Sequence, residues 1–278
     1  MDERQQRGEV AHPLDVSVLI AARDEEELLP GALASVRHWA GEVVVVLDPR
    51  SCDRTREVAA AGGAVVLEHP FVDSSTQLAW GVEQCRYDWV FILDADERAD
   101  ARVGVACARA LANPRCAAYR LRRRNLAFGR VLRFGDWGGD RVVRLLHRRQ
   151  GKLAGGMHWR VEAARIGRLA GWIEHHTLRS LPQYLPKLEH YATLGAQQLL
   201  AAGRRGGLGV GVLRGAWRFC RAYLVRLGFL DGQAGLLVAL LGAWGTFLKW
   251  ALLYELQGRR GGAGQAPEAP VPPGGAWR

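Results

Sequence analysis

Cysteines are few in this chain, and no two of them form a Cys-x-x-Cys pair. The five cysteines are scattered along the 278 residues at Cys52, Cys85, Cys107, Cys116 and Cys220. An odd number of scattered cysteines does not suit a disulfide framework, so we expect reduced thiols in a cytoplasmic protein. The first 14 residues are charged and contain no apolar run, so we expect no secretory signal there.

The chain also lacks a motif for binding nucleic acid, although it carries an excess of positive charge. The formal net charge of +10 favours acidic partners such as nucleic acid, anionic lipid or phosphorylated substrates. Because no RNA- or DNA-binding motif with aromatic stacking positions is present, we expect no nucleic-acid partner. Internal repeats are absent, and the apolar content of 49% excludes a disordered chain.

Apolar runs and helical segments alternate in the first part of the sequence. Runs typical of buried parallel strands lie at residues 16–20, 42–48, 64–69 and 88–96. Helices are predicted between them at residues 25–39, 54–61 and 77–85. This alternation predicts an α/β fold with a doubly wound, mostly parallel sheet and helices on both faces. Ligands of such sheets bind outside the carboxyl ends of the strands.

Two aspartates, Asp94 and Asp96, follow the fourth predicted strand in the segment Leu93–Glu97 (LDADE). Carboxylates in this arrangement suit a hard divalent cation, Mg²⁺ or Mn²⁺. Such a cation would bridge the diphosphate of a nucleotide-sugar and neutralise charge on the leaving group. A solvated turn after the strand is the other interpretation, and the position at a strand end favours the metal site.

Two further loops leave strands at the same edge. Ala22 and Arg23 follow the first strand, at the expected nucleotide edge. Asp48 ends the second strand, where a contact to the base or ribose and a structural turn are both open. Ser51 or Asp53 is expected to cap the next helix.

Together these motifs resemble family 2 glycosyltransferases of the GT-A fold, and among them the bacterial enzymes that add a hexose to the lipopolysaccharide inner core. The resemblance covers residues 15–257. It rests on the segments Ala22–Glu26, Leu47–Thr55, Asp94–Glu97, Arg124–Gly129, Asp140–Arg148, Tyr191–Gln197, Gly228–Leu236 and Phe247–Leu256. The family also has a V-H-E element whose glutamate is the natural catalytic base, and Trp159 stands in that position here.

The resemblance implies an inverting transfer of a hexose from a nucleotide-diphosphate sugar to a lipopolysaccharide-core, lipid-linked or other cell-envelope glycan acceptor. The implied nucleotide-sugar contacts are Ala22, Arg23, Glu25, Asp48, Gln77, Asp94 and Arg144. The implied metal ligands are Asp94, Asp96 and His175, for Mg²⁺ or Mn²⁺. Asp140 and Glu162 are the candidate bases. Structural roles stay open for Asp140, which has arginines around it, and for His175.

Two other enzyme-related functions stay open. Trp159 in place of the glutamate suits a family member that binds a donor without turnover. A nucleotidyltransferase also uses a nucleotide-binding α/β sheet, but it usually has a Gly-rich, basic loop after the first strand. The segment Ala21–Gly31 does not resemble such a loop.

The C-terminal part is predicted to be helical from residue 181. Residues 190–230 contain six arginines and no acidic residue, and residues 232–248 carry no charge. A membrane-spanning helix needs about 20 apolar residues, and each basic residue attracts anionic lipid by ~1 kcal/mol. We therefore expect a helix at the cytoplasmic face of the inner membrane, with a core-packing helix as the other interpretation. The predicted domains are a disordered lead-in (1–14), a catalytic domain (15–180), a helical extension (181–257) and a disordered tail (258–278).

Overall fold

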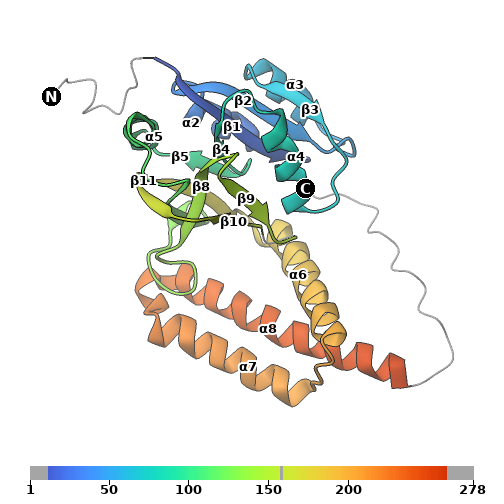
Figure 1. Cartoon of the computed structure of the whole chain (residues 1–278). Coiled ribbons are helices and arrows are strands. Elements are labelled where there is room, and N and C mark those ends of the chain that lie inside the picture. Colours follow the sequence, from blue (N-terminus) through green and yellow to red (C-terminus); the bar gives the residue numbers. More distant parts are fainter. Residues whose placement is uncertain (1–11, 157–158, 262–278) are drawn as a thin grey trace. The chain divides into compact units, whose positions relative to one another are not determined.

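The structure is a computed structural model that describes residues 12–156 and 159–261 (Figure 1). The chain divides into two compact units. The first contains residues 1–124 and 139–176, and the second contains residues 125–138 and 177–278. The segments predicted to be disordered, 1–14 and 258–278, lie outside the described residues except for 12–14 and 258–261.

The N-terminal part of the first unit alternates strands and helices as the sequence predicts. Its elements are β1 (Leu14–Ala22), α2 (Leu29–Val36), β2 (Ala40–Leu47), α3 (Thr55–Ala61), β3 (Val65–Glu68), α4 (Ser74–Gln84) and β4 (Trp89–Ile92). The four strands lie in the order β3-β2-β1-β4, and every neighbouring pair is parallel. The predicted α/β class is confirmed, and the carboxyl ends of the four strands share one edge.

Strand β1 is buried on both faces, which explains its uninterrupted apolar run. Val16, Val18 and Ile20 point to one side and pack in a cluster with α2 and with α5 (Arg102–Ala112). Leu19 points to the other side and packs with Leu78 of α4. Alternate residues of a strand face opposite sides, so helices cover both faces of the sheet.

Helix α2 begins four residues later than the sequence predicts. The backbone N–H groups of Glu25 and Glu26 donate to the side chains of Thr55 and Asp53, over 2.8 and 3.0 Å. Asp53 lies in the loop after β2, and Thr55 is the first residue of α3. Residues 26–28 therefore form a turn, and the helix starts at Leu29 with a proline in its first turn.

The sheet continues beyond β4 with antiparallel strands. These are β5 (Glu97–Ala99), β6 (Ala118–Ala127), β8 (Arg141–His147) and β11 (Ile166–Leu178), in the order β4-β8-β6-β11-β5. The pairings β4·β8, β6·β8 and β11·β5 are antiparallel. A separate two-stranded sheet joins β9 (Gly151–Ala154) and β10 (Arg160–Ala163). The pairing of β5 with β11 brings the segment after β4 to the middle of β11.

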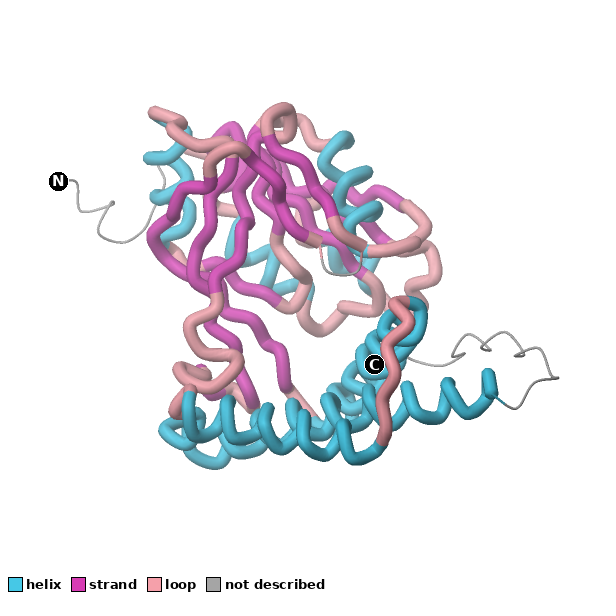
Figure 2. Tube along the Cα trace, turned by 60° about the horizontal axis from the view of Figure 1, so that its bottom comes forward, coloured by secondary structure: helices cyan, strands magenta, loops and turns pink. Residues whose placement is uncertain are grey.

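The second unit is mainly helical. It contains β7 (Arg130–Val131), which pairs with the end of β6, and the helices α6 (Leu181–Ala201), α7 (Leu208–Cys220) and α8 (Gly232–Gly261). A π-helical turn (Arg221–Val225) and a 3₁₀ turn (Gly228–Asp231) connect α7 to α8. Both α6 and α7 pack along α8, and α7 and α8 lie side by side in Figures 1 and 2.

One helical stretch among the described residues, Gly228–Arg259, is long and apolar enough to cross a membrane by length and composition. Its most apolar window has a mean hydropathy of 1.8, and 28% of that window is buried. The core helix of a soluble protein meets the same criterion. The side chains that α7 and α8 expose are therefore needed to choose between a membrane helix and a core helix.

Candidate functional site

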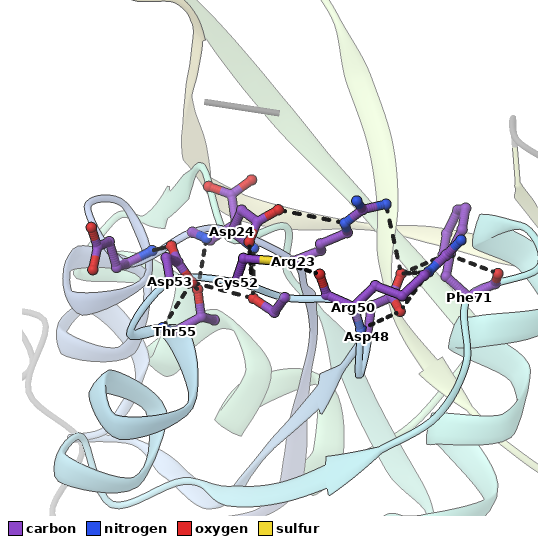
Figure 3. Close-up of polar contacts among 11 residues, drawn as sticks. Arg23, Asp24, Asp48, Arg50, Cys52, Asp53, Thr55 and Phe71 are labelled. Atoms are coloured by element: carbon purple, nitrogen blue, oxygen red, sulfur yellow. Dashed lines mark hydrogen bonds and ion pairs between the residues drawn. The ribbon is translucent and has the colours of Figure 1, made fainter. Parts of the chain in front are cut away.

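The loops after β1 and β2 are tied together by the side chains of Asp53 and Thr55 (Figure 3). One oxygen of Asp53 accepts a bond from the Glu26 N–H, and the other accepts one from the Thr55 N–H over 2.9 Å. Thr55 Oγ1 accepts from the Glu25 N–H. Burial alone would raise the pKa of Asp53, but the hydrogen bonds from Thr55 and Glu26 lower it below its ordinary value.

The predicted helix cap has a different form. Arg54 holds the N-cap position of α3 and makes no side-chain cap bond. Asp53 does bind the first N–H of the helix, as predicted, but it also holds the neighbouring loop. Ser51 is not a cap, because its hydroxyl accepts from the Asp24 N–H over 3.0 Å. Asp24 has the left-handed φ of 53°, which aspartate tolerates better than most residues.

Asp48 is a buried carboxylate, only 2% exposed, at the end of β2. Arg50 binds both of its oxygens in a bidentate fork, with Nε 3.0 Å from Oδ1 and Nη2 2.7 Å from Oδ2 (Figure 3). Arg23 Nη1 lies 4.0 Å from Oδ2, and the Asp48 N–H donates to the carbonyl of Ala22. Burial alone would raise the pKa of Asp48, but Arg50 lowers it, so the carboxylate is ionised.

Asp94 is joined to a buried arginine. Nη2 of Arg144 lies 2.6 Å from Asp94 Oδ2 and 2.6 Å from Glu97 Oε1. Arg144 is 2% exposed and Glu97 is fully buried, so these charges neutralise one another away from water. The carboxylates of Asp94 and Glu97 raise the pKa of Arg144 despite its burial. The ring of Trp159 lies 5.1 Å from the guanidinium carbon of Arg144.

Asp96 faces a histidine from another strand. His175 Nε2 lies 3.3 Å from Asp96 Oδ2, because the β5·β11 pairing places His175 opposite Glu97. Burial alone would lower the pKa of His175, but the carboxylate of Asp96 raises it above its ordinary value. Two ligand atoms bound to one ion at about 2.1 Å each lie roughly 3 Å apart, so this pair fits two positions on one cation.

The three predicted metal ligands are not equivalent. Asp96 and His175 face each other, whereas the carboxylate of Asp94 is bonded to Arg144. Within residues 12–156 and 159–261, no group of three or more His, Cys, Asp or Glu side chains is arranged to hold a metal ion. A cation at Asp96 and His175 would therefore take its remaining ligands from substrate phosphates and water, as Mg²⁺ commonly does.

The two candidate bases lie in different surroundings. Asp140 is 30% exposed and is bonded to Arg123 through Nε (2.8 Å) and Nη2 (2.7 Å). Arg123 also lies 3.6 Å from Glu97, which connects Asp140 to the Asp94 cluster. Glu162 lies on β10 of the separate two-stranded sheet, is 55% exposed and pairs with Arg160.

Gln77 has a structural role in this conformation. It is 2% exposed, its amide nitrogen donates to the carbonyl of His69, and its oxygen lies 2.8 Å from His69 Nδ1. Both ends of the amide therefore hold the segment that follows β3. The imidazole of His69 stacks on Trp80, with 4.4 Å between the ring centroids.

Two arginines at the site, Arg50 and Arg123, were not predicted from the sequence. Arg50 stands two residues after Asp48. In a turn, that spacing allows the guanidinium to bind both oxygens of the carboxylate, so the sequence did contain a signal for this contact. Arg123 belongs to the arginine-rich stretch of β6, where no local pattern separates it from its neighbours. Its role follows only from the pairing of β6 with β8, which places it near Asp140.

Comparison with models of protein families identifies the family of this chain. A model of glycosyl transferase family 2 matches residues 17–158, which include the loops after β1 and β2 and the Asp94–Asp96 segment. The chain belongs to glycosyltransferase family 2. The resemblance found in the sequence is thereby confirmed, and so is the assignment of the enzyme as a glycosyltransferase with the family's GT-A type of α/β fold.

Relatives of this glycosyltransferase cover most of its length. An uncharacterised glycosyltransferase of Rickettsia typhi is 25% identical over 257 residues, which is 87% of each chain. The lipopolysaccharide core biosynthesis glycosyltransferase LpsC of Rhizobium meliloti is 26% identical over 252 residues, covering 87% of this chain and 93% of LpsC. A solved structure of glucosyl-3-phosphoglycerate synthase from Mycobacterium tuberculosis, in complex with Mn²⁺, UDP and phosphoglyceric acid, is 18% identical with a TM-score of 0.34, covering 44% of this chain and 46% of the synthase.

Proposed function

We propose that this glycosyltransferase transfers a hexose from a nucleotide-diphosphate sugar to a lipopolysaccharide-core or related cell-envelope glycan acceptor, with inversion at the anomeric carbon. The observation that carries the proposal is the position of Asp48 and Asp94 at the carboxyl ends of β2 and β4, on either side of β1. That edge is where parallel sheets bind nucleotides. The name of the Rhizobium relative supports the choice of a lipopolysaccharide-core acceptor.

The donor binds along the loops after β1 and β2 in this proposal. Asp48 is an ionised acceptor for the base or ribose, and Arg23 lies beside it. Ala22 and Glu25 contribute backbone that is fixed by bonds to Asp48 and Thr55. Because these loops are already tied together, little ordering is needed when the nucleotide binds.

Arg144 is a positioning residue rather than a direct contact to the donor. Its guanidinium is buried against Glu97 and holds the carboxylate of Asp94 at the mouth of the site. The guanidinium is bonded to both carboxylates, and it leaves Asp94 partly exposed to the donor. This role explains why an arginine stands in the interior of the sheet.

Asp96 and His175 are the proposed ligands of Mg²⁺ or Mn²⁺. Their separation of 3.3 Å fits two positions on one ion, and a carboxylate and an imidazole are both ligands for Mn²⁺. When bound, the cation supplies positive charge to the diphosphate leaving group. The chain's own contribution is to hold the two ligand atoms together through the pairing of β5 with β11.

Asp140 is the proposed base. An inverting transfer requires a group that removes the proton of the acceptor hydroxyl, and such a base accelerates the reaction ~10²–10⁴-fold. Asp140 connects to the Asp94 cluster through Arg123, whereas Glu162 is paired with Arg160 on the separate hairpin. The geometry therefore favours Asp140 over Glu162 as the base in this chain.

Binding of a donor without transfer is the second candidate function, and one observation favours it. Trp159 occupies the place of the family glutamate and lies over Arg144, beside Asp94. An indole cannot accept a proton from a hydroxyl group. The two functions differ in turnover and not in donor binding.

A panel of nucleotide sugars tests the proposal and separates the two functions. The full-length protein is incubated with each donor, with Mg²⁺, Mn²⁺ or a chelator, and with lipopolysaccharide-core acceptors. The proposed function predicts metal-dependent transfer from one class of donor. Binding without transfer to any acceptor would favour the second candidate, and the absence of donor binding would contradict both.

A further inference from the structure

Helix α7 buries two of its three glycines and exposes most of its large apolar side chains. Gly211 and Gly215 face α8 so closely that a Cβ added to either would lie 3.2 Å from Phe247 or 3.0 Å from the Ala243 carbonyl. The exposed apolar residues of the same helix are Leu208, Val210, Val212, Leu213 and Trp217. A helix on the surface of a soluble protein has the opposite pattern, with apolar residues inside.

The exposed apolar surface continues beyond α7. The connecting turns expose Leu224, Val225, Leu227, Phe229 and Leu230, and α8 exposes Leu236, Leu240 and Trp244 at intervals of four residues. Seventeen of the twenty exposed large apolar residues in the described part of the chain belong to the second unit. Such concentration is not the normal scatter of single apolar residues and indicates an interaction surface.

The same unit carries most of the net positive charge. Its described residues include thirteen lysines and arginines but only four acidic residues. Three of the arginines, Arg218, Arg221 and Arg226, converge on the single carboxylate of Asp136 at 3.0–3.3 Å. One carboxylate does not balance three guanidinium groups, so the apolar surface lies beside uncompensated positive charge.

A groove of about 510 Å³ lies beside the exposed turn between α7 and α8. Arg130, Arg133, Phe134, Leu230 and Asp231 are among the residues that line it. Asp231 accepts hydrogen bonds from the backbone N–H groups of Arg133 and Phe134, over 3.0 and 2.9 Å, so it fixes the segment after β7 that carries Arg133. Arg130 and Arg133 are exposed, and a phosphate group is a suitable ligand for guanidinium groups.

We propose that this face of the second unit docks on an anionic lipid bilayer. The apolar side chains of α7, of the connecting turns and of the Leu236–Trp244 stripe enter the interface, and the phosphate of a lipid headgroup binds in the groove between Arg130 and Arg133. Interfacial helices combine large apolar side chains with basic residues in this way. Docking does not require the transfer reaction, so membrane binding and sugar transfer can fail separately.

Helix α8 lies along the interface and does not cross it. Trp250 and Leu253 are buried with Ala196 of α6, and Val238 and Leu241 are buried in another cluster of the same unit. A crossing helix would have to give up this packing and place Lys249 in the hydrocarbon region. Charge also disfavours a second copy of the chain as the partner of this surface. Two copies would bring two basic surfaces face to face, and like charges repel.

Vesicle sedimentation with the full chain tests the docking surface. Vesicles of phosphatidylcholine alone are compared with vesicles of phosphatidylcholine and phosphatidylglycerol in equal parts. We expect at least ~10-fold tighter binding to the anionic vesicles, with the difference lost at high salt. Equal binding to both kinds of vesicle, or no binding, would overturn the proposal.

A matched pair of variants tests which surface binds. Leu213 on α7 and Val72 in the first unit are both 73% exposed. We expect Leu213→Glu to weaken vesicle binding at least ~10-fold and Val72→Glu to leave it unchanged. Thermal unfolding is measured on both variants as a control for folding. Equal effects of the two substitutions would contradict docking through α7.

Two further measurements separate the remaining occupants. The double variant Arg130→Gln/Arg133→Gln should lose part of the preference for anionic vesicles and keep the residual binding to neutral ones. Light scattering without lipid should show no self-association that Leu213→Glu abolishes, since such a result would assign the face to a second copy. Resistance of the bound protein to extraction at high salt and alkaline pH would indicate a spanning helix and overturn the interfacial placement.

Discussion

The indole ring of Trp159 lies 5.1 Å from the guanidinium carbon of Arg144, and the same guanidinium is bonded to Asp94 and Glu97. The position at which the family resemblance implies a glutamate therefore lies beside the Asp94 cluster, and here it supplies an aromatic face. Because an indole is not a base, another side chain must act as the catalytic base. Asp94 must also be oriented by other side chains. The contacts of Arg144, Arg123 and Asp140 lead to the first two predictions.

Arg144→Ala should destabilise the fold strongly. It removes the closer of the two arginines beside the fully buried Glu97, and breaking a buried ion pair costs about 3–5 kcal/mol. Urea unfolding measures the free energy. Arg160→Ala, which breaks an exposed pair with Glu162, is the control and should cause no measurable change. If Glu97→Gln in the Arg144→Ala background restored none of the loss, the buried charge would not be its cause.

Asp140→Asn should lower kcat ~10²–10⁴-fold if Asp140 is the base, with little change in donor KM. The amide is nearly isosteric and can still accept a bond from Arg123, so the local fold is retained. Glu162→Gln is the matched variant and should change kcat less than about threefold, within the scatter of surface substitutions. The reverse order of the two effects would assign the base to Glu162 instead.

In the proposed donor site, Arg50 would compete with the nucleotide for Asp48. The fork between them uses both carboxylate oxygens, and Arg50 is 56% exposed, so the pair is worth only about 1 kcal/mol. We expect Arg50→Ala to tighten nucleotide binding about two- to fivefold, as measured by isothermal titration with a panel of nucleoside diphosphates. A loss of affinity would show that Arg50 moves to contact the donor.

The bonds of Asp53 predict a pH-dependent contribution to stability. Burial opposes the shift, but the bonds from Thr55 and Glu26 lower the pKa of Asp53 in the folded state. Its contribution is therefore present above the unfolded-state pKa of about 3.9 and is lost as the pH falls through the lower folded-state pKa. Urea unfolding at several pH values should show that the deficit of Asp53→Asn shrinks below about pH 4. A deficit independent of pH would count against this role.

The parallel half of the sheet follows from the sequence for a clear reason. Strands buried on both faces, such as β1 with Val16–Ile20, have continuous apolar runs, and their loops carry polar residues at the carboxyl ends. The placement of Asp48 and Asp94 at one edge then follows from the parallel order alone. The shortened α2 does not follow, because Thr55 and Asp53 take the N–H groups that a longer helix would use.

The contacts of the arginines could not be predicted from the sequence. Arg123 and Arg144 lie in a stretch with many arginines, and each side chain is long enough to reach several acids. Which carboxylate each one meets is set by strand pairing distant in sequence, as between β6 and β8. Glu162 shows the same limit: it lies on β10, which pairs with β9 in a separate sheet, and the spacing from Trp159 does not reveal this.

Metal-dependent nucleotide binding at Asp96 tests the central claim most directly. Isothermal titration of nucleoside diphosphates with and without Mn²⁺ is performed on the wild type, on Asp96→Ala and on Asp88→Ala, which removes a carboxylate just before the opposite end of β4. We expect Mn²⁺ to tighten binding by tenfold or more in the wild type and in Asp88→Ala, and to have no effect in Asp96→Ala. Binding that is absent, or that is the same with Mn²⁺ and with a chelator in the wild type, would contradict a metal-assisted nucleotide-sugar site.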